Sequence, residues 1–293
     1  MIGELMSEAL LFATAGLVAL PLLSRRFRHA LRPDEHVRFN AASIISGLVF
    51  LEVALMVCAL PVVASVGSGH LADRHFFPGD AFIGWTSAGI AALAALAMIL
   101  GFVRFRRIER SLRVEPWIGS HEQRDDHDLV VLDADEPMAY ALGGADPQIV
   151  VTTGLVKRLP PDELQAVLDH ELAHIRLGHG RFLALLGALE PIAQVVRPLR
   201  HVTAAARFAI EHSADAGTGD AGATRRALVR LGGRPEAGTV AVAAFAVGEI
   251  AERIHALSVP PQERAIRGLR PMLYFSAFGL AGLSLSTLIV YWI

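Results

Sequence analysis

Four segments of the chain are long and apolar enough to cross a lipid bilayer as helices. A spanning helix needs about 20 mostly apolar residues, and these segments cover residues 5–23, 41–66, 81–105 and 272–293. The chain is 53% hydrophobic and 19% charged, whereas about a quarter of the residues of a soluble domain are charged. We therefore expect an α-rich membrane protein, with three spanning helices before a polar central region and one after it.

The arginines predict how these helices are oriented. Arginine clusters occupy residues 25–38, 104–113 and 264–270. The loop 67–80, in contrast, contains a single arginine, Arg74, and no lysine. Positively charged segments next to spanning helices remain in the cytoplasm. The pattern therefore places the central region in the cytoplasm and both termini outside a bacterial cell membrane. The residues before the first span carry no Lys or Arg, which favours an uncleaved anchor over a signal peptide.

This topology divides the chain into three parts. Residues 1–110 hold the first three spanning helices, residues 111–270 form a cytoplasmic domain, and residues 271–293 form the last span. The net charge of −2 gives no basic field, so we expect no direct contact with nucleic acid. The single cysteine, Cys58, lies in the second apolar segment, which argues against a disulfide framework and a thiolate metal site.

Polar residues in and between the spans have ordinary explanations. Glu52 interrupts the second apolar segment, where a charge costs on the order of 3 kcal/mol, and we expect it to make a polar contact between helices. The external loop holds His70 and His75 near Asp73 and Asp80. We expect a solvated turn there, and a metal or small-molecule sensor is the alternative.

The first half of the central region has the pattern of a small sheet. Short, mostly apolar runs occupy residues 129–132, 139–142 and 149–152, and Gly and Pro separate the last two. Such runs are typical of strands, whereas the charged segment 121–128 is typical of a turn. An exposed edge strand can pair with an extended peptide, and either 139–142 or 149–152 is a candidate for that role.

A helix with a reactive motif follows the strands. Pro161 stands at its expected first turn with two acidic residues, Asp162 and Glu163, which favour the positive end of a helix. Apolar residues then recur at helical spacing, and Gly178 is a natural stop. The segment His170-Glu171-Leu172-Ala173-His174 therefore lies inside an amphipathic helix.

This spacing suits one zinc ion per chain. On a helix, residues four apart lie on one face, so His170 and His174 can direct two imidazole nitrogens at the same ion. Zinc lowers the pKa of a bound water to roughly 7. Glu171 can then take a proton from that water and pass it to a leaving amine.

A catalytic zinc needs a third protein ligand. In peptidases with a third histidine, a longer motif places glycine and histidine where this chain has Leu177 and Gly180, so that class is excluded. His179 lies one residue before the position that the third histidine has in that motif. We expect it to be solvated beyond the end of the helix.

A glutamate is the other common third ligand, and two candidates follow. We favour Glu211 over Glu190 because Asp215 lies four residues after it. One carboxylate can then bind zinc while the other accepts the second N–H of a ligand histidine. We expect His212 to face solvent.

The residues that carry these features also define a family resemblance. They are Tyr140–Gly154 (YALGGADPQIVVTTG), Pro161–Leu164, His170–His174 and Glu211–Asp215. Together with three spans before the motif and one after, they resemble the BlaR/MecR family of integral-membrane zinc endopeptidases. The resemblance implies a cytoplasm-facing, zincin-type α+β metallopeptidase domain of the glutamate-zinc class. It also implies cleavage of a regulatory protein, typically a DNA-binding repressor of the BlaI type.

Carried over to this chain, the resemblance assigns zinc binding to His170, His174 and Glu211. It makes Glu171 the catalytic base and Asp215 the partner of a ligand histidine. Family members that sense β-lactams carry a large external penicillin-binding domain after the last span, whereas this chain ends at Ile293. Antibiotic sensing is therefore not expected.

Two other interpretations remain. An HtpX-like quality-control peptidase typically has two spans before the motif and two between it and the zinc glutamate. Here only residues 182–196 are apolar in that interval, which is short for a span. A non-catalytic receptor or scaffold with a structural zinc is the alternative of another class. Such a site usually has four protein ligands, and it leaves Glu171 without a role.

Overall fold

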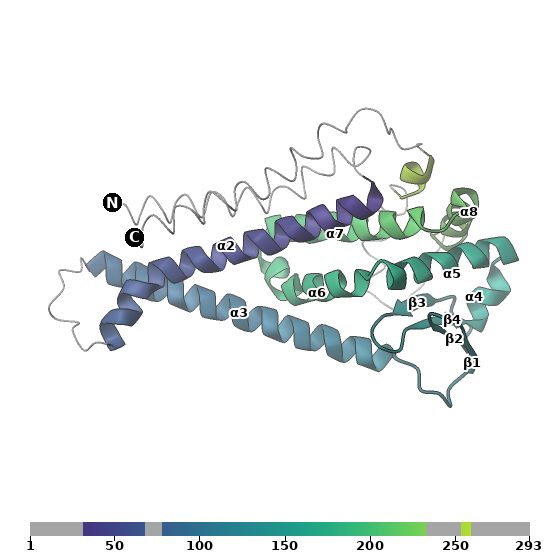
Figure 1. The fold of residues 1–293 in the computed structure, drawn as a ribbon, viewed down its shortest axis with the longest axis horizontal. Helices are drawn as coiled ribbons and strands as arrows, with labels where there is room; N and C mark the ends of the chain where they lie inside the picture. Colours follow the sequence, from purple (N-terminus) through teal and green to yellow (C-terminus); the bar gives the residue numbers. More distant parts are fainter. Residues whose placement is uncertain (1–31, 68–77, 233–252, 259–293) are drawn as a thin grey trace.

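Two long helices dominate one end of the molecule, and a small sheet with shorter helices forms the other (Figure 1). The computed structural model describes residues 32–67, 78–232 and 253–258. Helix α2 spans Pro33–Gly67 and α3 spans Pro78–Leu112. They contain the second and third predicted spans, whereas the first and fourth, and the loop histidines, lie outside the described residues.

Both long helices contain a stretch that is long and apolar enough to cross a membrane, judged by length and composition alone. These stretches are Pro33–Met56 and Gly84–Leu112. Each helix has 35 residues and is therefore about 52 Å long at 1.5 Å per residue. Only 11% of the α3 stretch is buried within the protein, against 39% of the α2 stretch. Most of α3 therefore presents apolar side chains to its surroundings.

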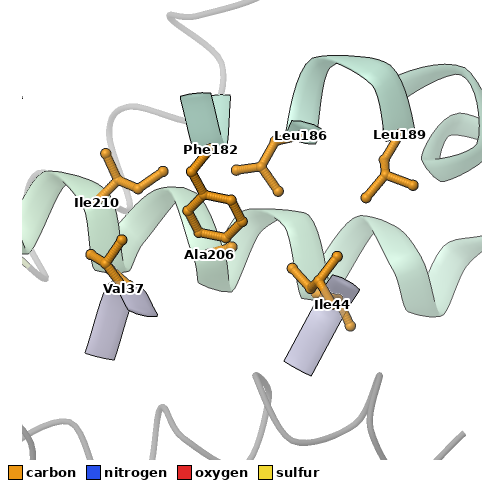
Figure 2. Close-up of a cluster of buried hydrophobic side chains, with 9 residues drawn as sticks. Val37, Ile44, Phe182, Leu186, Leu189, Ala206 and Ile210 are labelled. Carbon is orange, nitrogen blue, oxygen red and sulfur yellow. The ribbon is translucent and has the colours of Figure 1, made fainter. Parts of the chain in front are cut away.

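The buried part of α2 belongs to the core of the central domain. Helices α6 (His179–Val195) and α7 (Arg197–Ala216) pack on α3 and α2, respectively. Figure 2 shows the shared cluster, to which α2, α6 and α7 contribute Val37, Ile44, Phe182, Leu186, Leu189, Ala206 and Ile210. Burying each large side chain stabilises this packing by about 1.5–3 kcal/mol. The start of the second predicted span is therefore core, because hydropathy does not distinguish burial in protein from burial in lipid.

Small residues bring α3 and α6 close together. A Cβ atom added to Gly101 on α3 would lie 2.5 Å from the carbonyl oxygen of Ala188 on α6. One added to Gly187 would lie 2.6 Å from the ring of Phe105. Gly101 is thus required for this spacing of the two backbones, and Gly187 leaves room for the ring of Phe105.

The sheet has four strands in the order β1-β2-β4-β3. Strands β2 (Asp128–Leu132), β3 (Ala139–Leu142) and β4 (Gln148–Thr152) confirm the three predicted strands. Strand β4 is central and wholly buried, whereas β3, among the residues that the structure describes, pairs with β4 alone. Of the two candidates for an exposed edge, β3 is therefore the edge strand.

The expected turn at 121–128 is partly wrong, because Ser120–Gln123 form strand β1. β1 pairs antiparallel with β2 and is mostly exposed. The Nδ1 atom of His121 lies 2.6 Å from the Asp128 carboxylate of β2. A polar edge strand of this kind is held by backbone pairing and not by an apolar face, so its sequence has no alternating pattern.

The helix with the reactive motif confirms its prediction. Helix α5 spans Pro161–Arg176, with Pro161 in its first turn and two acidic residues beside it. Gly178 ends the segment in the left-handed conformation at φ 66°. Leu129, Ile149 and Leu155 of the sheet and of α4 (Thr153–Arg158) pack against the apolar face of α5, fixing the motif above β3. Helix α8 (Ala221–Gly232) packs on the other side of α5.

Candidate metal centre and catalytic site

Three side chains from two helices meet at one point. His170 and His174 come from α5, and their Nε2 atoms are 3.2 Å apart. Glu211 comes from α7; its carboxylate oxygens lie 3.4 Å from His170 Nε2 and 3.7 Å from His174 Nε2. The structure therefore brings together the three residues predicted to bind metal.

These separations fit a tetrahedral zinc site. With zinc–ligand distances of about 2.0–2.2 Å, ligand atoms lie about 3.3–3.6 Å from one another. The three observed distances, 3.2, 3.4 and 3.7 Å, bracket that range. Two imidazoles and one carboxylate also leave one position for water or substrate, as catalytic zinc sites do.

Asp215 contacts the ring nitrogen of His170 that faces away from Glu211. Its Oδ1 atom lies 3.0 Å from His170 Nδ1, so the other ring nitrogen faces Glu211. Burial opposes protonation of His170, but the carboxylates of Asp215 and Glu211, which accept its N–H groups, outweigh burial and raise the pKa of His170 to about 10. A divalent cation placed among these groups replaces that proton. The predicted pairing of a ligand histidine with a carboxylate is thus present.

His179 holds the second histidine, contrary to expectation. It is 3% exposed, begins α6, and its Nδ1 lies 3.1 Å from His174 Nδ1. The prediction of a solvated residue was wrong because Gly178 turns the chain back, so that α6 starts against α5. Burial lowers the pKa of His174 to about 4 and also lowers that of His179. Both rings are therefore neutral near pH 7, the form in which imidazole binds a metal.

Glu171 lies beside the three converging groups. Burial raises the pKa of this carboxyl to about 7, while His170 opposes the shift. The backbone N–H of Ala141 in β3 donates to it. A carboxyl poised near neutral pH can both accept and return a proton.

Arg253 is a site residue that the sequence pattern did not single out. Its Nε and Nη2 atoms donate to the two oxygens of Asp215 at 2.8 and 2.6 Å, and its Nη1 lies 3.0 Å from Glu211. Although burial raises the pKa of Asp215, the hydrogen bonds from Arg253 and His170 keep it below its ordinary value. No local pattern marks Arg253, because its partner lies 38 residues away.

The remaining candidates lie apart from this group of three side chains. Glu190 is half exposed and pairs with Arg207 at 3.3 Å. His212 was expected to face solvent, but it is half-buried, and its ring stacks on Phe208 with the centroids 6.0 Å apart. Of the two glutamates, Glu211 is thus the one that the structure places beside the two histidines.

A cavity of 890 Å³ opens beside His170 and Glu211. His170, Glu171, Glu211 and Arg253 form its inner end, and α4, α8, β3 and the loop 133–138 complete its walls. The site is therefore large enough for part of a peptide.

Comparison with known proteins agrees with this geometry. Residues 104–229 match Peptidase family M48. This M48 match includes the three converging residues, His170, His174 and Glu211, and also Glu171 and Asp215. It supports a metallopeptidase domain with the histidine–glutamate site described above.

Several curated proteases share part of the chain. A "Protease HtpX homolog" of Aeropyrum pernix is 33% identical over 117 residues, covering 33% of this chain and 37% of the relative. The "Plastoglobule-localized metallopeptidase 48, chloroplastic" of Arabidopsis thaliana is 45% identical over 64 residues, covering 21% and 19%. The chain thus spans well under half the length of these relatives. No solved structure matches the chain at comparable significance.

Proposed function

We propose that this protein is a membrane-embedded, zinc-dependent endopeptidase that hydrolyses peptide bonds of protein substrates. The observation that carries the proposal is the convergence of His170, His174 and Glu211 at 3.2–3.7 Å, with Glu171 beside them. The M48 match and the HtpX relatives support it.

The residues divide the chemistry among them. Zinc, when bound by the two histidines and Glu211, supplies Lewis-acid polarisation of the scissile carbonyl and a more acidic water. Glu171 accepts a proton as the water oxygen bonds to the carbonyl carbon, and donates it to the amine as the C–N bond breaks. Asp215 and His179 orient the ligand rings, and Arg253 holds Asp215 and Glu211 in place.

The membrane placement rests on the long helices and the arginines. α3 exposes large apolar side chains along most of its length, including Trp85, Leu93 and Phe102, which suits contact with lipid. The arginine clusters favour a cytoplasmic peptidase domain and external termini. This proposal includes the four-span topology and the boundaries of the peptidase domain at residues 110 and 270.

Two classes of substrate are compatible with this site. The HtpX relatives favour an HtpX-like protease, with a role in membrane-protein quality control. The three-plus-one arrangement expected from the sequence favours a BlaR/MecR-like enzyme that cleaves a BlaI-type repressor. Comparing proteomes of cells with active and Glu171→Gln protein distinguishes them: a single accumulated regulator supports the second, and many accumulated membrane proteins support the first.

The activity itself is tested with the variant Glu171→Gln in detergent-solubilised full-length protein. We expect one zinc per chain in both proteins, and cleavage of an unfolded substrate such as casein only by the wild type. Equal cleavage by the variant would overturn the proposed role of Glu171. Zinc-loaded wild-type protein without cleavage activity would favour the non-catalytic receptor or scaffold.

A further inference from the structure

We propose that the tip of the α6–α7 hairpin, residues 194–200, is inserted in the lipid bilayer as a re-entrant element that does not cross it. The tip enters the half of the bilayer that faces the peptidase domain, and lipid is its partner. This inference rests on the membrane placement of α3 in the proposed function, and it adds a second contact with lipid, made by the peptidase domain itself.

The packing of α6 on α3 gives the level of the tip. The two helices run antiparallel (Figure 1), and they approach closely at Gly101 and Ala188. Val195 lies seven residues after Ala188, about 10 Å along α6 at 1.5 Å per residue. The same distance back along α3 from Gly101 ends at Ala94, inside the apolar stretch Gly84–Leu112. The tip is therefore level with a part of α3 that we place in the bilayer.

The charges of α3 mark the edges of this apolar layer. Residues 81–103, between Asp80 and Arg104, carry no charge, and they extend over about 34 Å as a helix. This length is close to the hydrocarbon thickness of a bilayer, about 30 Å. Ala94, the residue level with the tip, is nearer to Arg104 than to Asp80. The tip therefore reaches into the layer from the side of the peptidase domain.

The side chains at this level are apolar and uncovered on both helices. On α3, Leu93 and Leu96 are 68% and 52% exposed, and on α6 Val195 is 83% exposed. Because α6 packs on α3, these side chains belong to one apolar surface that continues from the long helix onto the hairpin. A contiguous exposed apolar surface marks contact with a membrane or another protein. Its continuity with the surface of α3 favours lipid.

The reversal of the chain leaves few backbone groups without partners, as lipid requires. One residue, Val196, separates α6 from α7. Its N–H donates to the carbonyl oxygen of Ile192 at 2.8 Å, and its carbonyl oxygen accepts from the N–H of Arg200 at 3.2 Å. Pro198 lies in the first turn of α7, where its missing N–H removes one of the donors that a helix start leaves unpaired.

The charged residues of the hairpin suit a tip that stays close to the headgroups. Arg197 and Arg200 are exposed, and long basic side chains in this position extend their charge towards the lipid phosphates. Nearer to the peptidase domain, Glu190 of α6 pairs with Arg207 of α7 at 3.3 Å. Charged groups at membrane depth are paired in this way. The hairpin therefore enters and leaves the bilayer on the same side.

The inserted tip sets the distance between the bilayer and the candidate site. α6 begins at His179, which contacts His174, and α7 carries Glu211. Glu211 lies 14 residues after Arg197, about 21 Å along α7. The helices that support the second histidine and supply the glutamate are thus anchored in lipid at their other ends.

The test attaches a spin label to the tip and measures its collisions with oxygen, which concentrates in lipid, and with a water-soluble nickel chelate. Full-length protein carries Cys58→Ala, which removes its single cysteine, and one of Val195→Cys, Leu93→Cys or Val229→Cys. It is reconstituted in nanodiscs of phosphatidylcholine and phosphatidylglycerol. Leu93 is the control in lipid, and Val229, 59% exposed on α8 at the other end of the molecule, is the control in water (Figure 1).

We expect the oxygen-to-nickel collision ratio at residue 195 to match that at residue 93 and to exceed that at residue 229 several-fold. Nickel collisions at 195 as frequent as those at 229, with 93 still in lipid, would overturn this inference alone. A label at 195 shielded from both reagents would show that protein covers the tip, such as a second copy, and would also overturn it. Frequent nickel collisions at 93 would overturn the proposed membrane placement and this inference with it.

A second comparison needs no label. Val195→Asp and Val229→Asp both add a carboxylate at an exposed position, and an exposed substitution in water changes stability little. If the tip is in lipid, Val195→Asp places its charge in an apolar medium. We therefore expect Val195→Asp to lower the unfolding temperature in nanodiscs and Val229→Asp to leave it unchanged. Equal unfolding temperatures of the two variants would count against insertion of the tip and overturn the inference.

Discussion

Removing the guanidinium of Arg253 should destabilise the domain that contains the candidate site. The loss should be larger than the loss caused by removing an arginine from a surface ion pair. Asp215 is fully buried on its side chain, and Arg253, with 14% of its side chain exposed, binds both of its oxygens. The variant Arg253→Met leaves a buried carboxylate whose one remaining side-chain partner, within the described part of the chain, is His170. Breaking a buried pair in this way costs about 3–5 kcal/mol, which corresponds to a fall of roughly 6–20 °C in the unfolding temperature of a domain of this size.

The chain provides a control at the surface, where an arginine also binds an aspartate through two of its nitrogens. Arg176 binds Asp126 through two nitrogens at 2.8 and 3.0 Å, but its side chain is 64% exposed. An exposed pair contributes at most about 1 kcal/mol. Arg176→Met should therefore change the unfolding temperature by no more than about 4 °C.

The assay is thermal unfolding of the detergent-solubilised, full-length variants in the presence of a chelator, followed by titration with zinc. We expect Arg253→Met to unfold far earlier than Arg176→Met and to bind zinc about 10–100-fold more weakly, because Asp215 and Glu211 lose their support. Equal unfolding temperatures for the two variants, with unchanged zinc affinity, would refute the reasoning.

Two further predictions concern the second ligand and the packing of α3. His179→Ala should weaken zinc binding about 10–100-fold in a chelator competition, since His174 loses the neighbour 3.1 Å from its Nδ1; an unchanged affinity would assign His179 to packing alone. Gly101→Leu should lower the unfolding temperature, because its Cβ meets Ala188 at 2.5 Å, whereas Gly89→Leu, with nothing within 4 Å, should not. Equal stability of these two variants would contradict the close approach of α3 and α6.

The sequence predicted the site best where the signal was local. Helix α5 has a proline in its first turn, acidic residues beside it and a glycine stop, so its bounds and its two histidines followed from one segment. Glu211 and Asp215 followed from their spacing on a second helix. Each inference needed only the geometry of a single helix.

The missed features depend on contacts between distant segments. Arg253 acquires its role from a carboxylate 38 residues away, and His179 is buried by a turn that reverses the chain at Gly178. Val37 and Ile44 of α2 pack with residues of α6 and α7, yet the stretch Pro33–Met56 that contains them has the composition of a membrane span. Hydropathy measures the preference for leaving water and does not identify the medium that replaces it.

The central claim is that His170, His174 and Glu211 hold one zinc ion, and elemental analysis of purified full-length variants tests it most directly. We predict one zinc per chain in the wild type and in Glu190→Ala, whose carboxylate pairs with Arg207. Glu211→Ala should contain almost none. A full complement of zinc in Glu211→Ala, or its loss in Glu190→Ala, would contradict this account of the site.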